Sequence, residues 1–189
     1  MDKQKEHRRK CPCGSDEFFD ECCEKVSEGS TPEEIKRVVK RCVRKAFNDC
    51  NINRGEHCIY VSYVVKNLLE LHGIRSYVVA GSSKWIGYPI YYQWKPKSKI
   101  PEFHVWVVTQ YGETVDLACE DIHNRSDFAF TQTKKLGIPS PSTKWNKDLS
   151  DCEYVPKELG AKSFLIDMNA LNGLQKKAIE YHERYTNPK

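Results

Sequence analysis

Two helices are predicted near the start of the chain by apolar residues spaced three and four apart. The first is expected to have Thr31 as its N-cap, Pro32 in its first turn and Glu34 completing a capping box, and to end near Cys50. Its apolar stripe comprises Ile35, Val38, Val39, Cys42, Val43, Ala46, Phe47 and Cys50. Its opposite face is basic, which is more typical of a solvated helix face than of an anionic partner site. The second helix, over residues 55–73, is apolar enough to be buried on most sides.

Shorter apolar runs after the second helix predict an antiparallel hairpin beside a buried strand. The buried strand is expected over residues 76–81, and the hairpin strands over residues 103–109 and 114–118, with a turn at 110–113. A short turn places residues opposite each other when their numbers add up to about 221 or 222. The long aromatic segment 82–101 is expected to form either the wall of a substrate cleft or a cover over a dead site.

The last part of the chain has a weaker pattern. Residues 120–160 are expected to be irregular, residues 162–167 to form another strand, and residues 170–185 to form a closing helix. Helices next to an antiparallel hairpin indicate the α+β fold class.

Composition adds limits to this picture. The 189 residues are 39% hydrophobic and 11% aromatic, which is enough for one folded core. A net charge of +4 is too small to indicate a partner. No apolar run approaches the roughly 20 residues that span a bilayer, and the charged residues 1–10, a predicted flexible tail, are not followed by the apolar part of a secretion signal. We therefore expect no membrane span and a cytoplasmic, reducing location.

Four of the nine cysteines lie within thirteen residues: Cys11, Cys13, Cys22 and Cys23. In a reducing compartment such a cluster favours metal binding over disulfides. Four thiolates suit a tetrahedral Zn²⁺ ion, and a site with no open ligand position is structural. The alternative is four metal-free thiols crowded together.

The string CPCGS, followed by CC with eight residues between Cys13 and Cys22, resembles the SEC-C motif, a small zinc module found at the C-terminus of the SecA translocation motor and in other bacterial proteins. The resemblance implies a module over residues 11–25 with one structural zinc ion and a docking surface for a protein partner. That family commonly has a lysine-rich gap, whereas residues 16–21 here are mostly acidic. Nucleic acid is therefore an unlikely partner.

A second constellation consists of Cys58 at the start of a buried helix, His104 at the start of a strand and Asp116 on the next strand. The positive end of a helix dipole favours a thiolate. A nearby imidazole can take the thiol proton, and a carboxylate can fix the imidazole tautomer. The predicted hairpin register keeps contact between His104 and Asp116 possible.

The segment GEHCIYVSYVVKNLLELHGIRSYVVAG, followed by FHVWVV and ETVDLA, resembles the core of the transglutaminase-like superfamily of papain-like folds. The resemblance covers residues 55–118 and implies a papain-like domain over residues 31–189. It also implies that Cys58 is the nucleophile, His104 the general base and then acid, and Asp116 the residue that orients His104. The reaction would be thioester-mediated hydrolysis or acyl transfer on a peptide or amide, with the Cys58 backbone N–H as one oxyanion donor. Many members have an aromatic residue after the cysteine, where this chain has Ile59.

Two other functions compete with the enzyme hypothesis. The domain could be catalytically inert, acting as an adaptor that binds a protein partner through the zinc module and the basic helix face. A weaker alternative is nucleic-acid binding by the basic helix and the aromatic loop. The remaining cysteines, Cys42, Cys50, Cys119 and Cys152, are interpreted as core residues, and His57, His72 and His123 as surface or capping residues.

Overall fold

A five-stranded antiparallel sheet lies at the centre of the computed structural model, which describes residues 9–187. The strand order is β4-β3-β2-β1-β5. The strands are β1 (Ser76–Trp85), β2 (His104–Thr109), β3 (Thr114–Asp116), β4 (Lys144–Asn146) and β5 (Cys152–Leu159). The fold is therefore α+β, as predicted.

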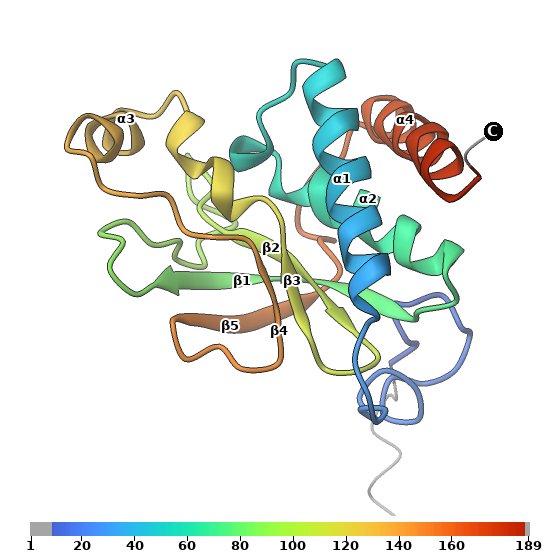
Figure 1. Cartoon of the computed structure of the whole chain (residues 1–189). Helices are drawn as coiled ribbons and strands as arrows, with labels where there is room; N and C mark the ends of the chain where they lie inside the picture. The colour runs from blue at the N-terminus through green and yellow to red at the C-terminus, as the bar shows by residue number, and fades with distance from the viewer. Residues whose placement is uncertain (1–8, 188–189) are drawn as a thin grey trace, which may run out of the picture.

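Three longer helices lie together on one side of the sheet, and a short one lies away from them (Figure 1). The three are α1 (Glu33–Asp49), α2 (Cys58–Leu71) and α4 (Met168–Thr186), and the short one is α3 (Phe128–Lys135). Two 3₁₀ turns, η1 (Arg54–Glu56) and η2 (Cys119–Asn124), contact each other. No helix within the described part of the chain is long and apolar enough to cross a membrane.

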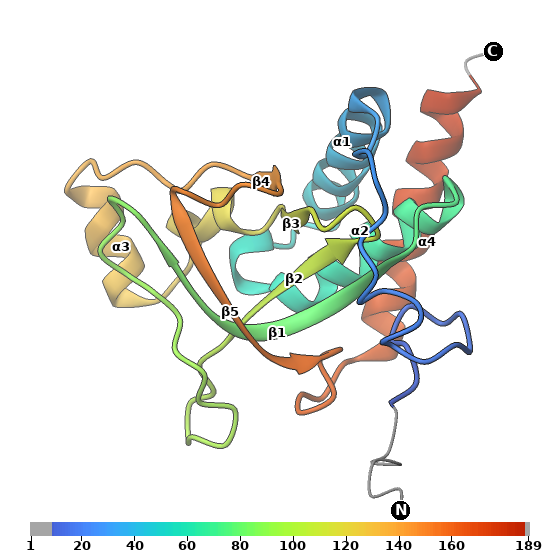
Figure 2. The same cartoon turned by 90° about the horizontal axis from the view of Figure 1, so that it is seen from below.

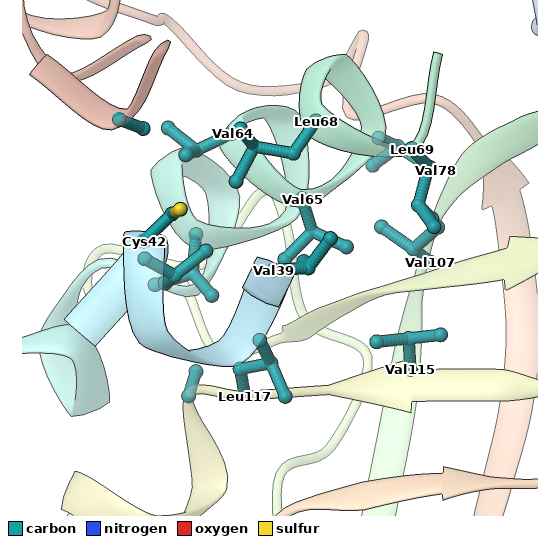
Figure 3. Packing of buried hydrophobic residues seen from close by; sticks show 14 of the residues in the cluster. Val39, Cys42, Val64, Val65, Leu68, Leu69, Val78, Val107, Val115 and Leu117 are labelled. Carbon is teal, nitrogen blue, oxygen red and sulfur yellow. The ribbon is translucent and has the colours of Figure 1, made fainter. Parts of the chain in front are cut away.

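The main core lies between the helices and the sheet, where α2 packs against β1 and β2 and is covered by α1 and α4. Figure 3 shows the apolar side chains that meet there: Val39 and Cys42 of α1, Val64, Val65, Leu68 and Leu69 of α2, and Val78, Val107, Val115 and Leu117 from the sheet side. Burying side chains of this size stabilises the fold by roughly 1.5–3 kcal/mol each. Because α2 contacts so many elements, its N-terminal end is held firmly in place.

The predicted hairpin is present, with its register confirmed. Val107 faces Val115 and Val108 faces Thr114, so facing residues have numbers that add up to 222. Strand β1 is longer than predicted because it continues to Trp85 and pairs with β5 as well as with β2. Gly81 permits this double pairing, since a Cβ atom there would lie 2.1 Å from the carbonyl oxygen of Val155.

The starts of the first two helices differ from the prediction. Helix α1 begins at Glu33, and the Thr31 side chain bonds the buried carboxylate of Glu113 instead of capping the helix. The helix predicted over residues 55–73 is divided into η1 and α2, which meet at His57. This division places Cys58 at the first position of α2.

Two predictions for the last third of the chain were wrong. Residues 120–160 are not irregular, because they contain most of η2 together with α3, β4 and β5. Residues 162–167 form no strand: a turn closes where the Phe164 amide bonds the carbonyl of Ala161, and Asp167 then caps α4. The predicted closing helix is present, and it begins two residues earlier, at Met168.

Residues 1–8 of the predicted tail lie outside the described residues. Arg9 and Lys10 belong with the cysteine-rich segment, because the Arg9 carbonyl accepts a hydrogen bond from the Phe19 amide and Lys10 forms a bridge with Phe18. In Figure 2 this segment lies beside the first residues of β1. The ring of Phe19 packs edge-on against Tyr77 of β1, with 5.4 Å between the ring centroids.

Candidate active site and metal centre

The turn before α2 fixes the position of Cys58. Asn53 accepts a hydrogen bond from the Gly55 amide through its side chain (2.8 Å), and its carbonyl oxygen lies 2.8 Å from Nδ1 of His57. Gly55 packs directly against η2, where a Cβ atom would lie 2.3 Å from the carbonyl oxygen of Asp121. Only glycine allows this approach, so the sequence before Cys58 ties the start of α2 to η2.

His104 and Asp116 form a buried pair, as their predicted register allowed. Nε2 of His104 lies 2.7 Å from Oδ2 of Asp116. Oδ1 of Asp116 accepts hydrogen bonds from the backbone amides of Ala118 (3.0 Å) and Cys119 (3.2 Å). The carboxylate is thus held on both oxygens, and it holds His104 by one ring nitrogen.

The charges of this pair stabilise each other. Burial alone would lower the pKa of His104, but the charge of Asp116 and the hydrogen bond to it, together with Cys58, outweigh burial and raise that pKa to about 10. Burial alone would raise the pKa of Asp116, but His104 and the hydrogen bonds to its oxygens lower it. An imidazolium–carboxylate pair is therefore the favoured state at neutral pH.

The other ring nitrogen of His104 is available to Cys58. Nδ1 is buried and has no hydrogen-bond partner of good geometry among residues 9–187. The Cys58 thiol is nevertheless close enough to contribute to the raised pKa of His104. Hydrogen bonds between reacting groups are often loose before substrate binds. The structure thus brings all three predicted residues together.

A cleft of about 420 Å³ leads to Cys58. Its walls come from Glu56, from the loop after β1, and from the region of η2 and α3. The lining residues include Ile90, Tyr92, Ile100, Arg125 and Phe130. The aromatic loop lines this cleft and also packs over His104. Ile90 and Ile100 form part of the wall, whereas Tyr92 stacks on His104, with 5.1 Å between the ring centroids and 14° between the ring planes.

Sequence reasoning missed several residues around the site. Trp85 lies edge-on to His104, with 5.3 Å between centroids, and the Tyr154 hydroxyl donates to Oδ2 of Asp116 at 2.7 Å. Arg125 donates to the carbonyl of Gly55 (3.2 Å) and the hydroxyl of Tyr92 (3.0 Å), which ties the loop to the turn before Cys58. Tyr154 lies on a strand that was not predicted.

The four clustered cysteines form a compact set of sulfur atoms. All are buried, and their Sγ atoms lie within 4.8 Å of one another. Sγ of Cys13 lies 3.5 Å from that of Cys22, which in turn lies 3.9 Å from that of Cys23. A tetrahedral site with metal–sulfur bonds of about 2.3 Å has sulfur–sulfur edges of about 3.8 Å. The cluster therefore has the size and the donor set to hold a metal ion.

The main domain contributes a cation to this cluster. Nη1 of Arg75, just before β1, donates to Sγ of Cys22 at 3.2 Å. The Arg75 backbone is held by Gln110 in the β2–β3 turn, with hydrogen bonds of 2.8 and 2.9 Å. The cysteine segment is therefore anchored to the sheet through Arg75 as well as through Tyr77.

The remaining cysteines and histidines were interpreted from sequence as structural. Cys42, Cys119 and Cys152 are buried, as expected for core residues, whereas Cys50 is exposed. Of the histidines, His72 is not an isolated surface residue, because its Nε2 lies 2.9 Å from Nε2 of His182 in α4. None of these residues joins the Cys58 cleft or the four-cysteine cluster.

Comparison with known proteins supports the fold but adds no activity. No protein-family model matches the sequence, and no curated protein matches it. The structure is similar to the crystal structure of a genomics target, with a TM-score of 0.56 and 12% sequence identity over 86% of this chain and 85% of that chain. At this identity the similarity concerns the fold alone.

Proposed function

We propose that the protein is a thiol-dependent hydrolase or acyltransferase that acts on a peptide or amide through Cys58, His104 and Asp116. The observation that carries the proposal is the state of His104: its Nε2 is held by a buried carboxylate, its buried Nδ1 has no hydrogen-bond partner among the described residues, and the nearby Cys58 thiol contributes to its raised pKa. The transglutaminase-like, papain-like assignment is part of this proposal. It agrees with an α+β fold in which a cysteine begins a central helix.

The reaction follows from these positions. In the reactive form His104 carries the proton and Cys58 is the thiolate, whose Sγ attacks the carbonyl carbon of the substrate. The first amides of α2 have no partner within the helix, so the Cys58 N–H is suited to stabilise the oxyanion. His104 then gives its proton to the departing amine, which leaves a thioester on Cys58. Water or a second amine attacks the thioester with His104 as base, and this step regenerates the thiol.

The cleft gives a substrate access to Cys58. Cys58 is 8% exposed and lines the cleft, so its sulfur can be reached without opening the core. Ile100 is 82% exposed on the cleft wall. The buried Asp116 and the stacked Tyr92 keep solvent from the back of His104.

A direct test is to look for the thioester. The purified protein is incubated with a library of peptide amides and peptide esters, quenched in acid and analysed by intact mass spectrometry. We expect a mass increase that maps to Cys58, is absent in Cys58→Ala and is unchanged in Cys50→Ser, the exposed control. If Cys58→Ala retains the turnover of the wild type, the proposed nucleophile is wrong. If no peptide acylates the wild type and Cys58 is no more reactive than Cys50, the inert adaptor becomes the better explanation.

We further propose that the metal is zinc and that its role is structural. Cys11, Cys13, Cys22 and Cys23 supply four thiolates and leave no open position for water or substrate. Protein purified under reducing conditions should contain one zinc per chain by elemental analysis. Cys22→Ser should lose the metal and Cys50→Ser should retain it; iron with visible absorbance, or no metal in the wild type, would contradict the proposal. A protein partner at this module remains a prediction.

A further inference from the structure

Four neighbouring strands each contribute one side chain to a chain of contacts behind Cys58. Asp116 comes from β3, His104 from β2, Trp85 from β1 and Tyr154 from β5. Figure 2 shows β5, β1 and β2 side by side in this part of the sheet. Tyr154 thus reaches Asp116 across two intervening strands, and the contact depends on tertiary structure rather than on a local turn.

The hydrogen bonds in this chain have a fixed direction. Nε1 of Trp85 lies 3.2 Å from the Tyr154 hydroxyl, and that hydroxyl lies 2.7 Å from Oδ2 of Asp116. An indole N–H can donate but not accept, whereas a carboxylate can only accept. Trp85 therefore occupies a lone pair of the Tyr154 oxygen, and the single phenolic proton must point at Asp116.

We propose that Tyr154, oriented by Trp85, is a positioning residue that sets the basicity of His104 through Asp116. Oδ2 of Asp116 accepts from Tyr154 and from His104 at the same distance, 2.7 Å, so the two donors share one oxygen. A donor that stabilises the carboxylate weakens its hold on the imidazolium proton. Tyr154 thereby moderates the basicity that Asp116 gives to His104 and leaves a base that can release its proton during turnover.

Burial suits Tyr154 to this role. It raises the pKa of the Tyr154 hydroxyl well above the ordinary value, as does the nearby charge of Asp116, so the group remains a neutral donor over the working pH range. The Tyr154 ring is also fixed by Trp106, with 5.0 Å between the ring centroids. Hydrogen bonds to a charged partner stabilise that partner by more than those to a neutral one.

The test is a pH titration of His104 in the full-length, metal-loaded protein. The titration is followed by ¹⁵N NMR of labelled histidine, and a His104→Gln variant identifies the His104 signals. Tyr154→Phe keeps the ring and removes the hydroxyl. In this variant we expect the midpoint pH of the His104 titration to rise by about one pH unit, which is a tenfold change in proton affinity. Trp85→Phe should move it in the same direction by less, because the freed hydroxyl can still donate to Asp116.

The matched control is Tyr88→Phe. Tyr88 is buried and contacts Trp85 edge-on at 6.4 Å, as Tyr154 does, but its hydroxyl bonds Thr133 and not Asp116. A purely structural role predicts similar losses of thermal stability in the two variants and no movement of the His104 midpoint. An unchanged midpoint in Tyr154→Phe, or an equal change in Tyr88→Phe, would overturn the inference.

The inference rests on the proposed function because it treats His104 as the base, but the two fail in different ways. If the midpoint moves as expected while Cys58 never forms a thioester, the hydrogen-bond chain stands and the enzyme proposal fails. If Cys58 forms the thioester and the Tyr154→Phe midpoint matches that of the wild type, the enzyme proposal stands and the role of Tyr154 fails.

Discussion

Replacing Asp116 by asparagine should destabilise the protein in a pH-dependent way. The Asp116 carboxylate accepts four hydrogen bonds, from His104, Tyr154 and two backbone amides. An asparagine amide fits the space, but its NH₂ group cannot accept, so at least one of these donors would face another donor. Removing one partner of a buried charged pair costs about 3–5 kcal/mol.

The structure gives a cost of similar size. The pKa of His104 is raised from 6.5 to about 10, against the opposing effect of burial and mainly by Asp116. At 1.36 kcal/mol per pH unit, the pair contributes on the order of 5 kcal/mol. Because His104 is 1% exposed, solvent screens this interaction little.

The pH range follows from the direction of the two pKa changes. A raised pKa stabilises the folded state fully below the unfolded value, here about 6.5, and the contribution disappears as the pH rises through about 10. The pKa of Asp116 is lowered, so its contribution is present above its ordinary value of 3.8 and disappears as the pH falls. The cost of Asp116→Asn should therefore be largest between about pH 4 and 6.5 and shrink toward pH 10.

Urea unfolding of the wild type and Asp116→Asn, measured from about pH 5 to 10, checks this prediction. Asp148→Asn is the control, because Asp148 is exposed and, within residues 9–187, its side chain accepts from the nearby Ser150 amide and not from the His104 site. A loss below about 1 kcal/mol, or one that stays constant or grows toward alkaline pH, would refute the charged-pair reasoning.

Two further predictions concern the metal centre and the turn before α2. Arg75→Gln should weaken metal binding by roughly tenfold, measured by competition with a coloured chelator. Arg37→Gln, a change at an exposed arginine, should leave the affinity unchanged. Equal affinities in the two variants would show that Arg75 does not support the metal site. Gly55→Ala should destabilise the protein by about 1–3 kcal/mol in thermal unfolding, because of the 2.3 Å clash described above. Gly173→Ala, which meets nothing within 4 Å in α4, should instead stabilise by about 0.5–1 kcal/mol, and similar effects of the two alanines would contradict the packing at Gly55.

The sequence was most informative where the periodicity was strong and contacts were local. The stripe of α1, the apolar face of α2 and the β2–β3 hairpin were predicted because their patterns extend over several turns or a short loop. The cysteine cluster was predictable because its four ligands lie within thirteen residues. The contact between His104 and Asp116 followed from the register of one hairpin.

Features that depend on distant contacts were missed. Proline is disfavoured inside a strand, but Pro156 lies in β5 at the edge of the sheet, where a missing N–H is tolerated. Without β5, Tyr154 could not be placed beside Asp116. The Thr31 cap failed for a similar reason, because the backbone N–H and the hydroxyl of Thr31 both donate to Glu113, 82 residues away, and its side chain does not cap the helix.

The most direct test of the account is the rate at which iodoacetamide alkylates Cys58, measured against pH. Peptide mapping follows the reaction in the wild type and in His104→Ala. Cys50 is the internal reference, because it is exposed and lies outside the cleft. An adjacent positive charge makes a thiol more reactive as a nucleophile. We predict that Cys58 reacts faster than Cys50 below about pH 7 and that His104→Ala removes this advantage. A Cys58 that reacts no faster than Cys50, or whose rate is unchanged by His104→Ala, would contradict the central claim.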